Sequence, residues 1–241
     1  SSLKKSNRFN PYAYSLRMHL ECSGNLLYGM NSLFGGPMND EGQYVVSDLA
    51  YAQYVKGDFD FTVRYRFNER NTILVHTGVG VAYPYGNSRI LPFEKRYFAG
   101  GANGMRGWSV RTLGPGRYRN SGRNIDLINQ TGDVKLDINL ELRSRLFWKL
   151  HSAVFVDAGN IWTLRKYDEQ PGGEFDVSTF CREIAFSYGV GLRLELDMFV
   201  FRLDGAMKAV NPAFEGDDKY PLLRPDFGRD FALHFAIGYP F

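Results

Sequence analysis

The residue types that most often carry catalysis or metal binding are few in this sequence and lie far apart. The two cysteines, Cys22 and Cys181, have no second ligand near them at a metal-binding spacing. The stretch Gly78-Val79-Gly80 lies inside an alternating segment, where it is typical of strand packing rather than of a phosphate loop. The histidines are also scattered, at His19, His76, His151 and His234. Since no nucleophile elbow is present either, we expect no catalytic residue, no metal and no cofactor.

One glycine-rich segment differs from the rest of the chain. Residues 98–108 read FAGGANGMRGW and residues 111–116 read RTLGPG. Glycine and proline mark turns, so a flexible loop is the simplest interpretation. The segment nevertheless keeps apolar side chains such as Met105, Trp108 and Leu113 among its glycines. A long loop with its own packing groups is more often functional than disordered, so we predict a functional loop over residues 84–132.

The segments that must position this loop alternate between apolar and polar residues, with a period of two. In residues 134–143, VKLDINLELR, all the charged side chains lie on one face and all the aliphatic ones on the other. The pattern predicts nine strands, at residues 12–22, 44–56, 59–67, 72–83, 134–143, 152–162, 184–196, 198–208 and 231–241.

The strand lengths and faces favour a membrane barrel over a soluble β-sandwich. Most of the predicted strands approach the ~9–11 residues that a tilted strand needs to cross a bilayer, whereas soluble strands are shorter. Their polar faces carry Arg, Lys, Glu and Asp with Gly, which suits a wet lumen, and their apolar faces suit lipid. The overall composition permits a barrel but does not distinguish it from a soluble domain: the chain has 241 residues, of which 44% are hydrophobic and 15% aromatic. Its net charge of +3 is too small to indicate binding of nucleic acid.

The connections are unequal in length, as in outer-membrane barrels. Residues 68–71 and 147–150 predict tight turns, which would face the periplasm, whereas 84–132, 163–183 and 209–229 are long and would face the exterior. Nine is an odd number, while single-chain bacterial barrels have even counts, so we expect further strands upstream of Ser1.

At this point two motifs resemble a known family. The Gly-Gly-x-x-x-Met-Arg-Gly-Trp run that ends at Trp108 is similar to the Arg-Gly-aromatic motif in the sixth extracellular loop of BamA/TamA-type outer-membrane insertases, the bacterial surface antigen superfamily. Residues 155–162 resemble the same family's strand motif aromatic-x-Asp-x-Gly-x-x-Trp, with Asp157 and Gly159 in place. Five predicted strands follow the loop, as in the family. The fuller pattern through Gly116 looks closer to TamA-like members than to BamA.

The resemblance implies a fold, an interior contact and a boundary. It implies that residues 1–241 are the C-terminal part of an outer-membrane β-barrel, all-β and antiparallel, with about nine of an expected sixteen strands. In the family the loop folds into the lumen, so Arg106 would pair with Glu141 and Asp157, while Gly107 lets the backbone approach the wall and Trp108 wedges the loop. Arginine suits this role because its guanidinium engages two carboxylates and stays charged. A glycosidase pair made of the same two acids is disfavoured, since the arginine would keep both ionised.

The last predicted strand carries a second implied role. A terminal strand with alternating aromatics and a final phenylalanine resembles the signal read during barrel assembly, and a plain lipid-facing strand has the same pattern. In the insertase family this strand also pairs weakly with the first, and the seam opens to template an incoming strand. The residues that fit these roles are Phe231, Phe235, Gly238, Tyr239 and Phe241.

We therefore expect a non-enzymatic factor of the bacterial outer membrane that inserts, assembles or exports other proteins through a lateral seam. The alternative is a passive porin-like or two-partner secretion channel. The expected partners are client outer-membrane proteins, outer-membrane lipids and lipopolysaccharide, and a periplasmic or inner-membrane protein. Lipopolysaccharide would meet a basic stretch of the long loop, although a solvated loop face explains the same charges: Lys95, Arg96, Arg117, Arg119 and Arg123.

Overall fold

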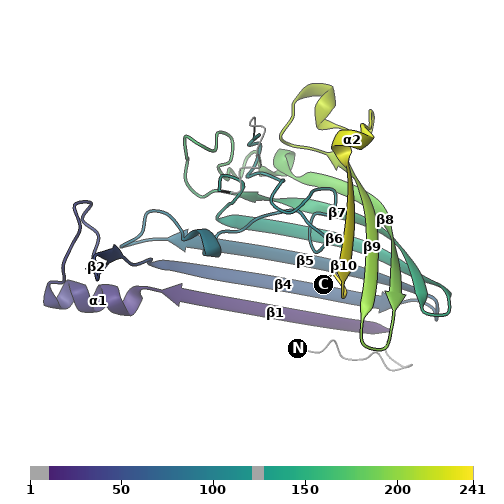
Figure 1. The fold of residues 1–241 in the computed structure, drawn as a ribbon, viewed down its shortest axis with the longest axis horizontal. Helices are drawn as coiled ribbons and strands as arrows, with labels where there is room; N and C mark the ends of the chain where they lie inside the picture. Colours follow the sequence, from purple (N-terminus) through teal and green to yellow (C-terminus); the bar gives the residue numbers. More distant parts are fainter. Residues whose placement is uncertain (1–10, 121–127, 241) are drawn as a thin grey trace.

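The computed structural model describes residues 11–120 and 128–240, and within them the chain forms one large antiparallel sheet. Its eight strands follow one another in the order β1-β4-β5-β6-β7-β8-β9-β10. The strands are β1 (Tyr12–Ser23), β4 (Tyr54–Arg66), β5 (Asn71–Pro84), β6 (Val134–Phe147), β7 (Leu150–Trp162), β8 (Ala185–Glu195), β9 (Val200–Val210) and β10 (Phe231–Ile237). Figure 1 shows that β8, β9 and β10 turn across the rest of the sheet, so the wall is strongly curved.

Short helices and one small hairpin complete the described fold. The helices are α1 (Asn25–Phe34), η1 (Phe93–Lys95), η2 (Phe180–Glu183), η3 (Gly216–Lys219) and α2 (Phe227–Asp230), and the hairpin is β2 (Val45–Val46) with β3 (Leu49–Ala50). In the described part of the chain, no helix has the length and apolar character that a membrane crossing requires.

The predicted strand at residues 44–56 is wrong. Ser47 and Asp48 have φ of 51° and 64°, a left-handed pair that closes the β2–β3 hairpin, and β4 begins only at Tyr54. The turn residues are Ser and Asp rather than the Asn-Gly, Asp-Gly or Gly-Gly pairs that most often mark such a two-residue turn, so the sequence did not reveal the reversal. The described sheet therefore has eight strands rather than nine, and the antiparallel all-β class holds.

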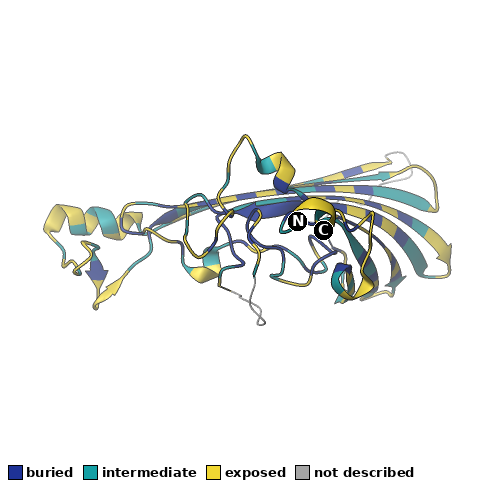
Figure 2. Ribbon diagram, turned by 90° about the horizontal axis from the view of Figure 1, so that it is seen from above, coloured by how far each residue is buried: buried dark blue, intermediate teal, exposed yellow. Residues whose placement is uncertain are grey.

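Burial along the strands is the reverse of burial in a soluble protein. Arg193, Arg202 and Glu141 are among the largest side chains that are fully buried, whereas outward residues such as Val190 and Leu140 are 64% and 49% exposed. Figure 2 shows the buried and exposed residues alternating along the strands, with the irregular segments collected on the inner side of the wall. An apolar outer face and a charged inner face are the arrangement of a barrel in lipid.

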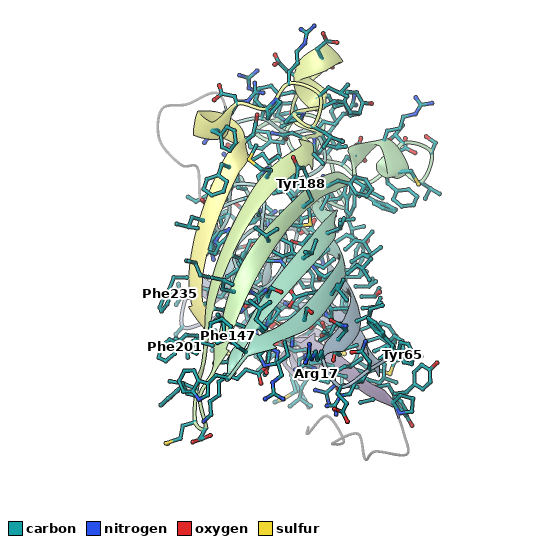
Figure 3. All side chains as sticks on the ribbon, turned by 90° about the vertical axis from the view of Figure 1, so that its right-hand side faces the viewer. Arg17, Tyr65, Phe147, Tyr188, Phe201 and Phe235 are labelled. Carbon is teal, nitrogen blue, oxygen red and sulfur yellow. The ribbon has the colours of Figure 1, made fainter. Side chains whose placement is uncertain are left out.

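Aromatic side chains gather on the outer face near the short turns. Figure 3 shows Phe147, Phe201 and Phe235 toward this end of the wall, and the rings of Phe201 and Phe235 are stacked with centroids 6.2 Å apart. Tyr12 and Tyr65 form a second stacked pair, at 4.6 Å, at the same end of β1 and β4. Such a ring of aromatics marks the membrane interface in outer-membrane barrels.

The outer face should show a depth-dependent tolerance of charge. We expect Leu140→Arg, in the middle of β6, to lower the free energy of unfolding by about 2–4 kcal/mol, and Leu146→Arg, near the turn, by about 0–1 kcal/mol. Both leucines are 49% exposed, which makes the pair matched. Urea unfolding of the full-length protein in lipid vesicles measures the difference, and equal costs at the two positions would contradict a lipid-facing wall.

Candidate functional site

The long connection between β5 and β6 folds back against the inner face of the wall. Its described part is joined to itself by isolated bridges between Tyr97 and Gly132 and between Ala99 and Leu113, and the amide of Gly116 donates to the carbonyl of Ile161 on β7 at 2.8 Å. Its apolar residues form a core with residues of β4, β5, β7 and β8, so the loop is packed as the sequence indicated. The members of that core are Tyr54, Ala82, Leu91, Tyr97, Ala99, Met105, Trp108, Leu113, Ile161 and Ala185.

The base of this loop holds a buried carboxylate just before β6. Asp133 is 1% exposed, accepts a hydrogen bond from the backbone amide of Leu164 at 3.0 Å, and lies 3.9 Å from Nε of Arg96. Burial raises the pKa of Asp133 above its ordinary value, although the Leu164 amide and the Arg96 charge oppose the rise. The loop is thus anchored at its end as well as at its tip.

At the tip, the structure places Arg106 between two carboxylates of the wall. Its Nη1 is 2.5 Å from Oε2 of Glu141 on β6, and its Nη2 is 2.7 Å from Oδ1 of Asp157 on β7. Nε and the backbone amide of Arg106 also donate to Oδ2 of Asp157, at 2.9 and 3.1 Å. The guanidinium lies 3.5 Å from the ring centroid of Phe155, and all three charged side chains are fully buried. Charge-assisted, bidentate bonds of this kind are strong and fix geometry.

The contact belongs to a larger network of buried charges that the sequence did not single out. Glu141 also accepts from Nε of Arg143 at 2.6 Å and lies 3.2 Å from Nη2 of Arg193. Arg193 in turn pairs with Asp204 on β9 at 2.5 Å, and Asp204 lies 3.3 Å from Nε of Arg202. These residues lie on the polar faces of alternating strands, which is the signal that could have found them, but only the register places them together.

Two glycines permit the close approach of backbone at this site. A Cβ atom at position 107 would lie 2.5 Å from Cβ of Ser187, and the amide of Gly107 donates to the hydroxyl of Ser187 at 3.2 Å. At Gly159, a Cβ would lie 2.1 Å from the carbonyl oxygen of Leu136 on the neighbouring strand. Neither position accepts a side chain without movement of its neighbour.

The loop tip also contacts the last strands of the sheet. Trp108 is 3% exposed, with Nζ of Lys208 on β9 5.7 Å from its ring centroid. Nη2 of Arg202 donates to the side-chain oxygen of Asn103 at 2.6 Å. On β10, Nε2 of His234 lies 2.8 Å from the carbonyl oxygen of Arg106 and donates to it. The loop tip therefore bonds to residues of β6 through β10. His234, which its position in the sequence does not distinguish from the other three histidines, is a functional candidate.

The structure places the predicted seam residues in two groups. Phe231 and Phe235 are 43% and 67% exposed on the outer face of β10. The strand ends at Ile237, because Gly238 has a φ of 98°, so the prediction of one face continuing to residue 241 is wrong. Tyr239 turns to the inner side, where its hydroxyl donates to Glu195 and its ring centroid lies 4.5 Å from the guanidinium carbon of Arg143. Phe241 lies outside the described residues.

The basic stretch of the long loop is partly neutralised by ion pairs. Nζ of Lys95 lies 2.5 Å from a carboxylate oxygen of Glu21, and the hydrogen bond that it donates to Glu21 raises the pKa of Lys95. Arg117 lies 3.3 Å from Glu183, whereas Arg123 falls outside the described residues. The arrangement gives no specific support to a lipopolysaccharide site.

With this geometry in view, comparison with known proteins gives the family. The chain matches the Omp85 superfamily domain over residues 23–241. It belongs to the Omp85 superfamily. Members of this superfamily are outer-membrane barrel proteins without an enzymatic reaction, so this Omp85 chain is a β-barrel portion located in the bacterial outer membrane.

The relatives of this Omp85 chain include an assembly factor. Over 155 residues it is 26% identical to the outer membrane protein assembly factor BamA of Neisseria meningitidis serogroup B (strain ATCC BAA-335 / MC58), covering 57% of this chain and 19% of that protein. Among solved structures it resembles BamA from Haemophilus ducreyi lacking POTRA domains 1–3, with 16% identity, a TM-score of 0.48, and coverage of 94% of this chain and 50% of that one. CdiB from Acinetobacter baumannii aligns at 15% identity and a TM-score of 0.45, over 78% of this chain and 27% of that one. The chain thus spans about a fifth to a half of these proteins.

Removal of the Arg106 guanidinium should destabilise the loop without abolishing the barrel. We expect Arg106→Ala to lower the free energy of unfolding by about 3–5 kcal/mol, because the buried Asp157 loses its ion pair and Glu141 loses one of three arginines. Water that enters the lumen would reduce this cost. The folded band on unheated gels should then unfold at a lower temperature. Arg119→Ala, an exposed arginine of the same loop, is the control. An unchanged unfolding temperature for Arg106→Ala, or normal complementation by Asp157→Asn, would refute the interior contact as a stabilising element.

The close approach at position 107 gives a prediction that depends on a pair of residues. We expect Gly107→Ala to cost about 1–3 kcal/mol of stability through overpacking against Ser187. The second change Ser187→Gly should recover part of that loss, because it removes the colliding Cβ. A double-mutant cycle on urea unfolding measures the coupling, and strictly additive costs would show that the two positions do not touch.

Proposed function

We propose that this chain is the C-terminal part of an outer-membrane insertase barrel that inserts or assembles client proteins at a seam beside β10. In this proposal residues 1–241 supply eight strands of a barrel of about sixteen, and residues 84–132 supply its luminal loop. The pattern from Arg106 to Gly116 supports a TamA-like member more than a BamA-like one. No covalent chemistry is required, because strand exchange provides the reaction.

The observation that carries the proposal is the shortness of β10, the last strand, combined with its link to the loop tip. β10 pairs with β9 over seven residues, whereas the other strands of the described sheet contain 11 to 14 residues. An unpaired strand edge presents a row of amide and carbonyl groups that recruits another strand. A short edge strand therefore supports templating of an incoming client strand.

The end of β10 supports a seam that opens. After Ile237 the chain leaves the sheet at Gly238, and Pro240 has no N–H to donate to a neighbouring strand. Pairing with a first strand would accordingly be limited at this end, so opening would begin there.

The loop and the seam would be coupled through His234. Because its ring donates to the backbone carbonyl of Arg106, any movement that peels β10 away from the loop must break this bond. Arg106 is in turn held by Glu141 and Asp157 on β6 and β7. The loop would thus hold the edge strand in place until a client strand replaces its contacts.

The partners follow from this role as parts of the proposal. They are client outer-membrane proteins, the surrounding lipids and lipopolysaccharide, and a periplasmic or inner-membrane protein that delivers clients. The alternative function is a passive channel, and a steady ionic conductance of the reconstituted full-length protein, with no effect on client folding, would favour it. Small periplasmic domains ahead of this chain would favour the insertase.

Client insertion tests the proposal directly. A photo-crosslinking residue at Leu233, on the outer face of β10, should capture the terminal strand of a client barrel during its assembly in proteoliposomes that contain the full-length protein. The same residue at Val154, on the outer face of β7 with neighbours on both sides, is the matched control. Equal capture at the two positions, or none at Leu233 while the client folds, would refute a seam at β10.

His234 tests the coupling independently of any client. We expect His234→Phe to speed hydrogen exchange of the β10 amides by about twofold to thirteenfold, as one lost hydrogen bond of about 0.5–1.5 kcal/mol implies. In an Arg106→Ala background the same change should have little further effect, because the loop carbonyl has already lost its position. Mass spectrometry of the peptide that contains β10 gives the rates. Full additivity of the two substitutions would separate His234 from the loop.

A further inference from the structure

A pocket of 540 Å³ opens on the inner side of the wall at the end where the short turns lie. We call it the turn-end pocket. It lies between β4 and β8 and is bordered by the β4–β5, β6–β7 and β8–β9 turns. The cations that line it are Arg64, Arg66, Arg70, Arg143, Arg145 and Lys149.

The positive charge of the turn-end pocket is only partly balanced. Its carboxylates are Glu69, Glu195 and Asp197, of which Asp197 pairs with Lys149 at 2.5 Å and Glu195 lies 3.5 Å from His151. Within residues 11–120 and 128–240, no ion pair involves the other four arginines of the lining. Those four are Arg64, Arg66, Arg70 and Arg145.

A buried donor in the wall of the pocket has no partner. Arg143 is 8% exposed, and its Nε is used by Glu141 at 2.6 Å. In the described part of the chain, its Nη2 makes no hydrogen bond. The ring centroid of Tyr239 lies 4.5 Å from the carbon of the same guanidinium. A buried guanidinium nitrogen without an acceptor carries a desolvation cost that an anion in the pocket would remove.

We propose that the turn-end pocket binds an acidic polypeptide segment, and that several carboxylates of the bound segment pair with the arginines of the pocket. Lipid is disfavoured as the occupant, because the pocket lies on the inner side of the wall while the membrane-interface aromatics, such as Tyr65 and Phe147, lie on the outer side. The cations extend from β4 to the β6–β7 turn, a width of roughly 14 Å at about 4.8 Å per strand. An extended acidic segment of about four residues matches this width at roughly 3.3 Å per residue.

Binding can be measured without any insertion reaction, so its failure and that of the proposed function are distinguishable. The probe is a fluorescein-labelled hexaglutamate peptide, with its hexaglutamine analogue, added to the full-length protein in micelles of a neutral detergent. We expect saturable binding of the glutamate peptide by anisotropy, weakened by salt, and none of the glutamine peptide. Arg64→Gln with Arg145→Gln should raise Kd by about fivefold or more, since two ion pairs are lost.

Two control variants are needed: one keeps the positive charge at the same two positions, and the other removes two positive charges outside the pocket. Arg64→Lys with Arg145→Lys should stay within about threefold of the native Kd, because the charge is retained. Arg182→Gln with Arg224→Gln, two exposed arginines in the long connections, alters net charge equally and should leave binding unchanged. Equal loss of binding in both glutamine pairs would overturn the pocket as the site. Absence of peptide binding, or binding of short-chain phosphatidylglycerol but not of the peptide, would overturn the polypeptide assignment.

Discussion

The interior of this protein depends on the burial of one guanidinium between two carboxylates. Arg106 is carried by a loop, while Glu141 and Asp157 are carried by adjacent strands, and none of the three is exposed to water. Without the loop, Asp157 would lose its ion pair, and Glu141 would keep only those to Arg143 and Arg193. The loop also buries apolar side chains such as Met105 and Trp108, but it is Arg106 that fixes its position against the two strands. The ion pair therefore makes the wall and the loop one unit.

The same constraint explains why the charged residues are inside and the aliphatic residues outside. The outer face must contact hydrocarbon, where each unpaired polar group is costly, so Val, Leu and aromatic residues occupy it. The inner face then receives the polar side chains of every strand, and each charge there needs a partner. Arg193 on β8 pairs with Asp204 on β9, which extends to the next strands the network of ion pairs that includes Arg106. Stability of the lumen side thus comes from compensated charge more than from an apolar core, which is confined to the part of the loop near Trp108.

The edge strand β10 differs from the remainder of the wall in what holds it. Its backbone pairs with β9 over seven residues, and on the inner side His234 bonds to the loop backbone. Since a strand that pairs over few residues is held by few backbone hydrogen bonds, a contact from the loop has a larger relative effect there than on the longer strands. A loop that is locked by Arg106 at β6 and β7 and reaches β10 gives a mechanical connection between the middle of the wall and its edge. The turn-end pocket lies at the end of the lumen where the short turns are. Four of its arginines form no ion pair within the described residues, so its positive charge is left without a matching number of carboxylates.

The amino-acid sequence by itself determined the class of the fold, because an alternation of period two with lipid-compatible lengths has few other solutions. It also determined which side of each strand is polar, and the motif at Arg106 with its two acids could be read as a unit. Tertiary structure alone decided three further points. The Ser47–Asp48 turn interrupts the predicted second strand, and its two residues are not the glycine-containing pair that marks such turns in sequence. Tyr239 lies inside rather than on the lipid face, because a single left-handed glycine at 238 reverses the pattern. His234 meets Arg106 across 128 positions of sequence, and such a contact depends on the curvature and register of five strands, which no local pattern encodes.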